Sequence, residues 1–169
     1  MSKTILLAVD TTSQTAAAVD MARDLATATG DRVVVLHVHE IAVGRFGRMQ
    51  VDCGDGEGEK VVTAIADRLT WAGVQAQADI RKTPVGHIAR TISGVADELD
   101  VRMIILGSGS AHDVPRLPFG SVSLRLLHIA CTPVLIVPRS PAPIRQPAAT
   151  VTTAAAAAAA PAAAVGATS

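Results

Sequence analysis

The chain has 169 residues, and its 15 basic and 15 acidic side chains balance to a formal net charge of zero. This balance, together with only one tryptophan, two phenylalanines and no tyrosine, argues against a basic or base-stacking surface for nucleic acid. No uninterrupted run of strongly apolar residues is long enough for a membrane span, and the N-terminus lacks a signal-peptide pattern, so we expect a cytoplasmic protein without a membrane partner.

Short apolar runs alternate along the chain with segments of helical spacing. The first half predicts a strand over 3–10 (KTILLAVD), a helix over 13–29, a strand over 32–38 (RVVVLHV), a polar loop from about 40 to 58, and a helix over 59–72. Gly30 and Gly73 follow the two helices, where glycine commonly ends a helix.

The second half continues the alternation. It predicts a strand over 74–80, a helix over 84–99, a strand over 101–107, a helix over 120–130 and a strand over 132–138. The segment 74–80 alternates apolar and polar residues, which is typical of a sheet edge. Pro84 suits a first helical turn, and apolar residues recur at helical spacing from Val85 to Leu99. Cys131, just before the last strand, is expected to be buried.

Short apolar strands separated by amphipathic helices predict a parallel sheet covered by helices on both faces. Ligands of such sheets bind beyond the carboxyl ends of the strands. Asp10, Val38 and Gly107 all stand at predicted carboxyl ends. The sequence therefore predicts that a binding site lies at this edge.

The C-terminal segment has a different composition. Residues 140–169 contain fourteen alanines, four prolines and one charged side chain, Arg145. Such a segment lacks the large apolar groups that would offset the entropy of ordering it. We expect one folded domain over 1–139 and a disordered tail over 140–169.

A long connection, GSGSAHDVPRLPFGSVS, joins the strand over 101–107 to the helix over 120–130. Gly107 allows a ligand to approach the backbone closely. Gly120, Ser121 and Val122 open the helix, where amides and the helix dipole favour an anion. The Ser121 hydroxyl either binds a phosphate oxygen or caps the helix, and Arg116 offers a charge-assisted contact.

These motifs, in this order, resemble the universal stress protein family over residues 3–138. The nucleotide loop of that family has a glycine, two residues, a second glycine, nine residues, and then glycine followed by serine or threonine. Gly107, Gly120 and Ser121 fit the outer positions, and ILLAVD, VVVLHV and CTPVLIVP match elsewhere. The resemblance implies a five-stranded parallel sheet in the order 3-2-1-4-5.

The resemblance also implies a function. Many family members bind ATP, many form dimers through the last strand, and the expected ligand is adenine nucleotide, ATP with or without Mg²⁺. Asp10 and Thr11 would then lie near the adenosine, Val38 would contact the adenine, and the phosphates and ribose would face the loop residues Gly107, Gly120, Ser121 and Val122. A homodimer through residues 132–138 is the expected assembly, in a small stress-response regulator.

One position departs from the family pattern. Ser110 stands where the middle glycine is expected, so it either adds a hydroxyl for phosphate or hinders the close approach of a ligand. The alternative is therefore a nucleotide-independent interaction module of the same fold that has lost ATP binding through Ser110.

Other side chains favour neither metal binding nor catalysis. His37 and His39 share one strand face, but no carboxylate or cysteine is placed to complete a metal site, so packed side chains are the favoured interpretation. No nucleophile has a base beside it in the sequence, so we predict no catalytic residues and at most weak ATP hydrolysis.

Overall fold

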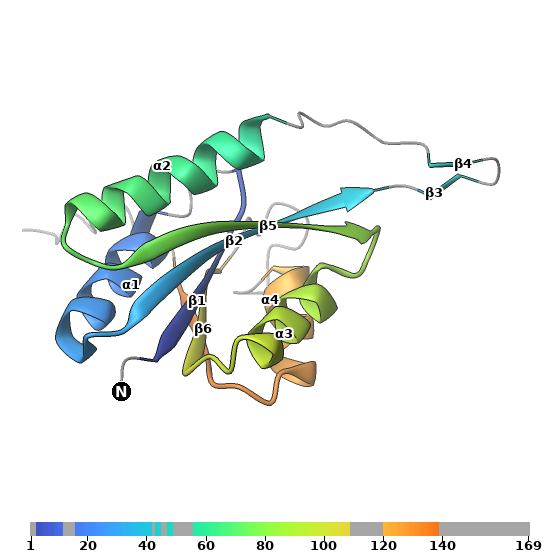
Figure 1. The fold of residues 1–169 in the computed structure, drawn as a ribbon. Coiled ribbons are helices and arrows are strands. Elements are labelled where there is room, and N and C mark those ends of the chain that lie inside the picture. Colours follow the sequence, from blue (N-terminus) through green and yellow to red (C-terminus); the bar gives the residue numbers. More distant parts are fainter. Residues whose placement is uncertain are drawn as a thin grey trace, which may run out of the picture.

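A computed structural model describes residues 3–11, 16–41, 43–44, 47–48, 56–108 and 120–138. A five-stranded parallel sheet lies between two layers of helices (Figure 1). Its strands are β1 (Thr4–Val9), β2 (Arg32–Ile41), β5 (Ala76–Pro84), β6 (Met103–Gly107) and β7 (Val134–Val137). The helices are α1 (Ala16–Thr29), α2 (Glu57–Trp71), α3 (Ile88–Glu98) and α4 (Ser121–Ile129). The tail predicted over 140–169 lies outside the described residues.

The strands are arranged in the order β5-β2-β1-β6-β7, and each neighbouring pair is parallel. Counted along the chain, this is the order 3-2-1-4-5, so the predicted fold is confirmed. The chain runs outward from β1 through β2 to β5 and then crosses to β6 on the other side of β1. The direction of winding therefore reverses between β1 and β6, which is where sheets of this kind place their ligands.

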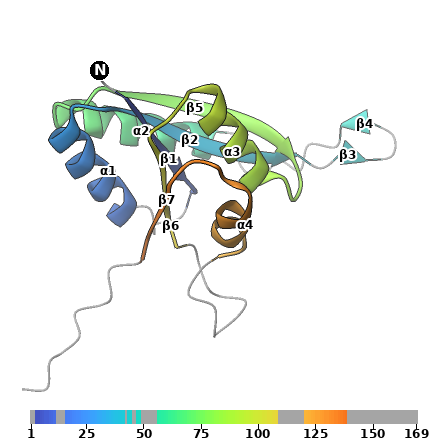
Figure 2. The same ribbon diagram turned by 90° about the horizontal axis from the view of Figure 1, so that it is seen from below.

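Each face of the sheet has its own hydrophobic core. Alternate strand residues such as Leu7 and Val35 pack under α1 and α2, and the residues between them, such as Leu6 and Val34, pack under α3 and α4. Figure 2 shows the two helix layers on opposite sides of the strands. This double coverage explains why strands such as β1, β2 and β6 are continuous apolar runs, whereas the edge strand β5 is not.

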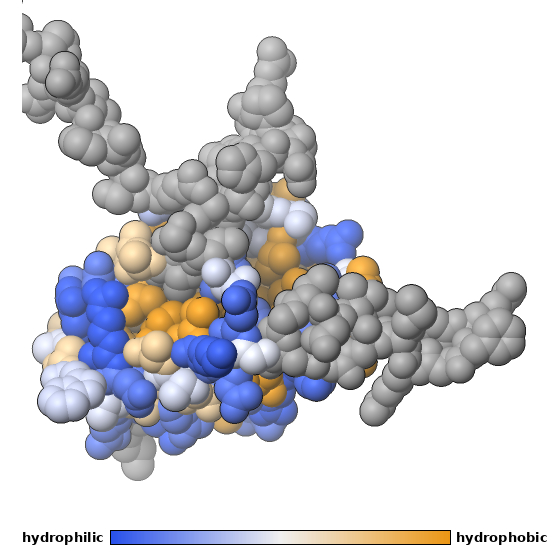
Figure 3. All heavy atoms as spheres, turned by 90° about the horizontal axis from the view of Figure 1, so that it is seen from above, coloured by the Kyte–Doolittle hydropathy of each residue, from blue (hydrophilic) through white to orange (hydrophobic). Residues whose placement is uncertain are grey.

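Apolar residues also reach the surface at the margins of these cores. A space-filling view from above shows them among hydrophilic residues (Figure 3), and Ile65, Met103 and Leu135 are partly buried residues packed against the core under α1 and α2. Cys131 is exposed, so the prediction that it is buried is wrong. Across the described part of the chain, every helix is too short or too polar to cross a membrane.

Two predicted boundaries are wrong around Pro84. The proline ends strand β5, and α3 begins only at Ile88. A proline is tolerated there because β5 is an edge strand, as its alternating pattern predicted, and Pro84 is its last residue. Val85 is 61% exposed and does not belong to the buried face of α3.

The predicted polar loop from 40 to 58 contains regular structure. Strand β2 extends to Ile41, and a short antiparallel pair follows, formed by β3 (Val43–Gly44) and β4 (Gly47–Arg48). This pair stands away from the helices at one end of the molecule (Figure 1). Too few residues take part for a repeating pattern to predict it from the sequence.

A buried carboxylate joins the strands at the amino edge of the sheet. Asp31, just before β2, accepts hydrogen bonds from the Lys3 amide at 2.8 Å and the Thr29 hydroxyl at 2.7 Å. The guanidinium of Arg102, just before β6, lies 3.1 Å from the same carboxylate, whose side chain is completely buried. Asp31 therefore connects the starts of three neighbouring strands.

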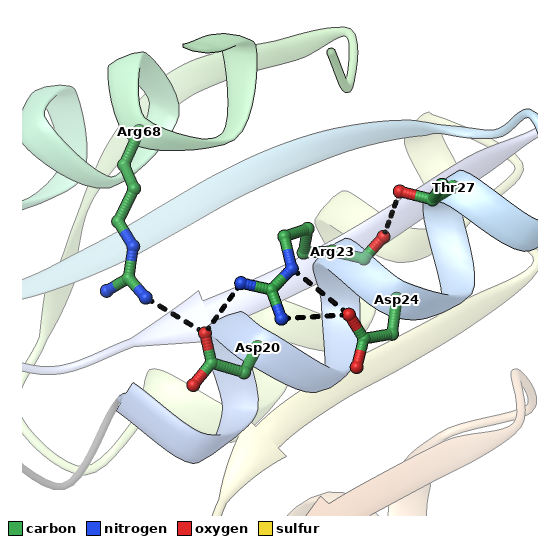
Figure 4. A network of polar contacts seen from close by, with 5 residues as sticks. All are labelled: Asp20, Arg23, Asp24, Thr27 and Arg68. Atoms are coloured by element: carbon green, nitrogen blue, oxygen red, sulfur yellow. Dashed lines mark hydrogen bonds and ion pairs between the residues drawn. The ribbon is translucent and has the colours of Figure 1, made fainter. Parts of the chain in front are cut away.

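A second polar network joins α1 to α2 on the surface (Figure 4). Asp20 of α1 accepts from Arg68 of α2 at 2.9 Å and from Arg23 at 3.3 Å, and Arg23 also contacts Asp24 at 2.9 Å. These side chains are well exposed, so we expect the network to add less than about 1 kcal/mol per pair.

Two glycines predict opposite effects of the same substitution. Gly30 follows α1 with φ of +70°, whereas Gly94 lies inside α3, and a methyl group at either position meets no atom within 4 Å. We expect Gly30→Ala to destabilise the fold by about 1 kcal/mol through its backbone conformation, and Gly94→Ala to stabilise it by up to about 1 kcal/mol. Chemical denaturation of both variants measures this, and equal signs would contradict it.

Candidate functional site

The strand register brings the predicted site residues together at the carboxyl edge. Val9 pairs with His37 of β2, and Ala8 pairs with Leu106 of β6. Continuing both registers by one residue places Asp10 beside Val38 and Val9 beside Gly107. The ends of β1 and β6 and residue Val38 of β2 therefore lie level along one rim, at the point where the winding reverses. Strand β2 itself continues to Ile41 because it still pairs with β5 there, so the prediction that Val38 ends a strand is wrong.

The rim is exposed to solvent just after β1 and buried at Val38 of β2. Asp10 and Thr11 are exposed, whereas Val38 is buried in the core under α3 and α4. Val38 shares this core with Leu126 of α4, so its side chain lies on the face of the sheet that α3 and α4 cover. Exposed polar residues and a buried apolar residue thus stand side by side along this rim.

Both ends of the long connection between β6 and α4 lie at this rim. The Gly120 amide donates a hydrogen bond of 2.7 Å to the Ser108 carbonyl, and the Ser123 hydroxyl donates one of 3.3 Å to the Gly107 carbonyl. The Ser108 amide in turn donates to Val137 of β7. These bonds hold the start of α4 directly against the end of β6.

The start of α4 differs from the prediction in its details. Gly120 is the N-cap, and its amide already bonds Ser108, so the prediction that this amide faces an anion is wrong. Ser121 is the first helical residue and is exposed, so it does not act as the cap. The first-turn amides of Ser121 and Val122 have no acceptor within the helix, as at any helix start. Together with the helix dipole, they suit an anionic group.

Two predicted site residues, Ser110 and Arg116, lie outside the described residues. The described ones fit an adenine nucleotide in their chemistry, because an apolar side chain at Val38, a carboxylate at Asp10 and the start of α4 share one edge. Among the described residues, no group of three or more histidine, cysteine, aspartate or glutamate side chains is arranged to hold a metal ion.

A clamp on the backbone of one residue, Gly86, was not predicted. The Gly86 amide donates to the Glu40 carboxylate at 2.7 Å, and the Arg125 guanidinium donates to the Gly86 carbonyl at 3.0 Å. Gly86 has φ of +82°, a conformation that favours glycine. The clamp joins β2 and α4 through the turn before α3. A glycine between Val85 and His87 was the only signal in the sequence, and it does not identify its partners.

The comparison with protein families decides the identity of this fold. The model of the universal stress protein family matches residues 1–138. The chain belongs to the universal stress protein family. The family resemblance predicted from the sequence motifs is thereby confirmed. A search of curated proteins finds no match.

Solved structures of the universal stress protein family share the architecture. A family member from Burkholderia pseudomallei is 27% identical, with a TM-score of 0.64 over 80% of this chain and 96% of that one. The Archaeoglobus fulgidus protein in complex with dAMP is 21% identical, with a TM-score of 0.63 over 79% and 96%. A universal stress protein in complex with cAMP is 18% identical, with a TM-score of 0.64 over 82% and 98%.

Proposed function

We propose that this universal stress protein binds adenine nucleotide, ATP in the first place, at the carboxyl edge of its sheet, and acts in the cytoplasm as a dimeric stress-response regulator. The single observation that carries the proposal is the junction of β6 and α4, where the Gly120 amide bonds Ser108 at 2.7 Å. That junction sets the first turn of α4 at the end of β6, which neighbours β1 in the sheet and is two strands from β2.

The assigned roles follow from the chemistry of each group. Val38 offers the adenine ring the small part of its apolar side chain that is exposed, since the residue is 8% exposed. Asp10 and Thr11 offer polar atoms to the adenosine, and Ser121 and Val122 offer amides to a phosphate. Two structural neighbours were crystallised with dAMP and cAMP. Both ligands are adenine nucleotides, which supports this ligand class for the present chain.

Titration calorimetry with ATP tests the proposal directly. We expect saturable binding with a dissociation constant at or below about 100 μM, equivalent to about −5.5 kcal/mol. A dissociation constant of about 100 μM gives nearly full occupancy at about 1 mM ATP. The absence of both heat and a thermal shift at that concentration therefore removes the binding proposal.

A charge at the start of α4 separates binding from folding. Ser121→Glu adds a carboxylate that favours the helix dipole but repels a phosphate, so we expect unchanged or higher stability and at least about tenfold weaker ATP binding. Ser121→Ala is the matched control, because it removes only the hydroxyl. Calorimetry and thermal unfolding measure both quantities. Equal ATP affinity in the natural chain and Ser121→Glu would place the phosphates elsewhere.

The two edges of the sheet support a dimer through β7. Edge strand β5 carries Asp79, Arg81 and Lys82, and charged edges resist pairing. Edge strand β7 (VLIV) has no charge, and the exposed apolar residues Leu124, Leu127 and Ile129 lie on nearby α4. Sedimentation equilibrium is expected to give twice the mass of 17.3 kDa, and a monomer at all concentrations contradicts this part of the proposal.

The alternative is an interaction module of the same fold that works without nucleotide. Ser110 favours it, because serine replaces glycine in the loop pattern. The variant Ser110→Gly distinguishes the two functions. If it creates ATP binding that the natural chain lacks, the module is the correct interpretation. If both forms bind ATP equally, Ser110 is compatible with nucleotide.

A further inference from the structure

His37 lies between the end of β1 and the start of α2. Its Nδ1 is 3.0 Å from the Val9 carbonyl oxygen. A carbonyl can only accept, so Nδ1 carries the proton and donates this hydrogen bond. Val9 is the last residue of β1, and Val9–His37 is the last pair between the two strands. The side chain therefore adds a bond where the ladder of backbone bonds ends.

This bond sets the direction of the next peptide. The Val9 carbonyl and the Asp10 amide belong to one planar unit and point in opposite directions. Fixing the carbonyl with His37 therefore fixes the Asp10 amide as well. On the same strand as His37, the next residue is Val38, which faces the opposite side of the sheet. His37 thus belongs to the backbone of β2 next to Val38, and its side chain bonds the backbone of β1 next to Asp10.

The other edge of the ring is held by α2. A methyl group on Gly58, in the first turn of α2, would lie 2.5 Å from His37 Cδ2 and 2.7 Å from Nε2. Real carbon atoms do not approach so closely, so no side chain fits at this position while the ring stays in place. Glycine at position 58 leaves room for the helix to pack directly on the imidazole.

We propose that His37, held in place by Gly58, is the positioning residue of the nucleotide site and orients the Val9–Asp10 peptide for binding. This inference rests on the proposed function, because Asp10 and Val38 are its adenosine and adenine contacts. It makes α2 part of the site, although no residue of α2 is among the proposed contacts. A shift of α2 then changes nucleotide affinity through the ring.

Two substitutions of His37 test the role of the hydrogen bond. His37→Leu introduces an apolar side chain of similar size that has no hydrogen-bond donor. His37→Asn keeps a donor, because its amide nitrogen is the same number of bonds from the backbone as Nδ1 of histidine. We expect His37→Leu to weaken ATP binding about tenfold and His37→Asn to stay within about threefold of the natural chain. Equal losses in both variants would overturn the inference, because bulk rather than the bond would then matter.

Amide hydrogen exchange at Asp10 tests the same inference without nucleotide. We expect His37→Leu to accelerate exchange at Asp10 at least about tenfold, while His37→Asn preserves the natural rate. Val35→Ala, two residues earlier on the same strand face, is the control for a general loss of stability. Exchange at Asp10 that is unchanged in His37→Leu, or equally accelerated in Val35→Ala, would overturn the inference. If the natural chain binds no ATP, the proposed function fails, but this measurement still decides the role of His37.

A double-mutant cycle tests the contact with α2. Gly58→Ala alone is expected to displace the ring and to accelerate exchange at Asp10 as His37→Leu does. In a His37→Ala background the added methyl group meets no ring, so Gly58→Ala is expected to have less than about a twofold further effect. Additive effects in the two backgrounds would show that Gly58 does not act through His37.

Discussion

Asp31→Ala is expected to lower the free energy of unfolding by about 3 kcal/mol. The carboxylate is completely buried, at 0% exposure of its side chain. Removing it takes this acceptor from three donors: the Lys3 amide, the Thr29 hydroxyl and the Arg102 guanidinium. Hydrogen bonds to charged groups contribute about 1.5–3 kcal/mol each, partly offset here by the cost of burying the charge. The effect is large because one side chain serves three strands.

Urea denaturation with a matched control measures this effect. Asp24→Ala removes a carboxylate that is 66% exposed and contacts Arg23 of the same helix, so we expect a loss below about 0.5 kcal/mol. Similar losses of unfolding free energy in the two variants would show that the buried hydrogen bonds of Asp31 contribute little to stability.

The same carboxylate predicts a dependence on pH. Burial by itself raises the pKa of Asp31, but the Thr29 hydroxyl, the Lys3 amide and the charge of Arg102 outweigh it, so the pKa lies below its ordinary 3.8. The folded state therefore binds this proton less readily than the unfolded state. The stabilisation is fully present above pH 3.8 and is lost as the pH falls through the lower pKa of the folded chain. Asp31→Asn should lose this part of the acid dependence, and an unchanged acid profile would contradict it.

Leu126→Ala is expected to cost about 3 kcal/mol of unfolding free energy. Leu126 is 0% exposed and packs in the core under α3 and α4. Only Ser123 and Leu126 of α4 are buried, so this leucine is the main apolar contact of the helix. Truncating it removes the burial and leaves a cavity.

The neighbouring residue provides the control. Leu127 is 46% exposed, so Leu127→Ala removes the same atoms from a position open to solvent, and we expect a loss below about 1 kcal/mol. Thermal and urea unfolding of both variants make the comparison. Equal losses would mean that α4 is not held to the sheet by Leu126.

Local patterns in the sequence predicted much of the fold. Continuous apolar runs such as VVVLHV predicted buried strands, and the alternation in 74–80 predicted an edge strand. The strand order did not follow from these patterns and came from the family resemblance. Pro84 was misplaced because a proline suits both a helix start and the end of an edge strand.

The candidate site was predictable where it depends on strand ends and less so where it depends on contacts. Asp10 and Gly107 follow from their places at the ends of apolar runs, whereas Val38 ends its apolar run but lies inside β2, which continues to Ile41. The bond between His37 and Val9 joins residues 28 positions apart, and no local pattern contains such a distance. The hydrogen bond from the Gly120 amide to the Ser108 carbonyl was missed for a similar reason, because a backbone amide leaves no signal in the sequence that indicates its partner.

The clamp on Gly86 has a consequence for the order of assembly. Its two hydrogen bonds span 46 positions to Glu40 and 39 positions to Arg125, so the loop-closure entropy of two long segments must be overcome before both can form. The clamp can close only when β2, the turn before α3 and α4 have all reached their native places. A partly folded chain, such as one still emerging from the ribosome before residue 125, therefore lacks it, and this side of the rim is completed late in folding.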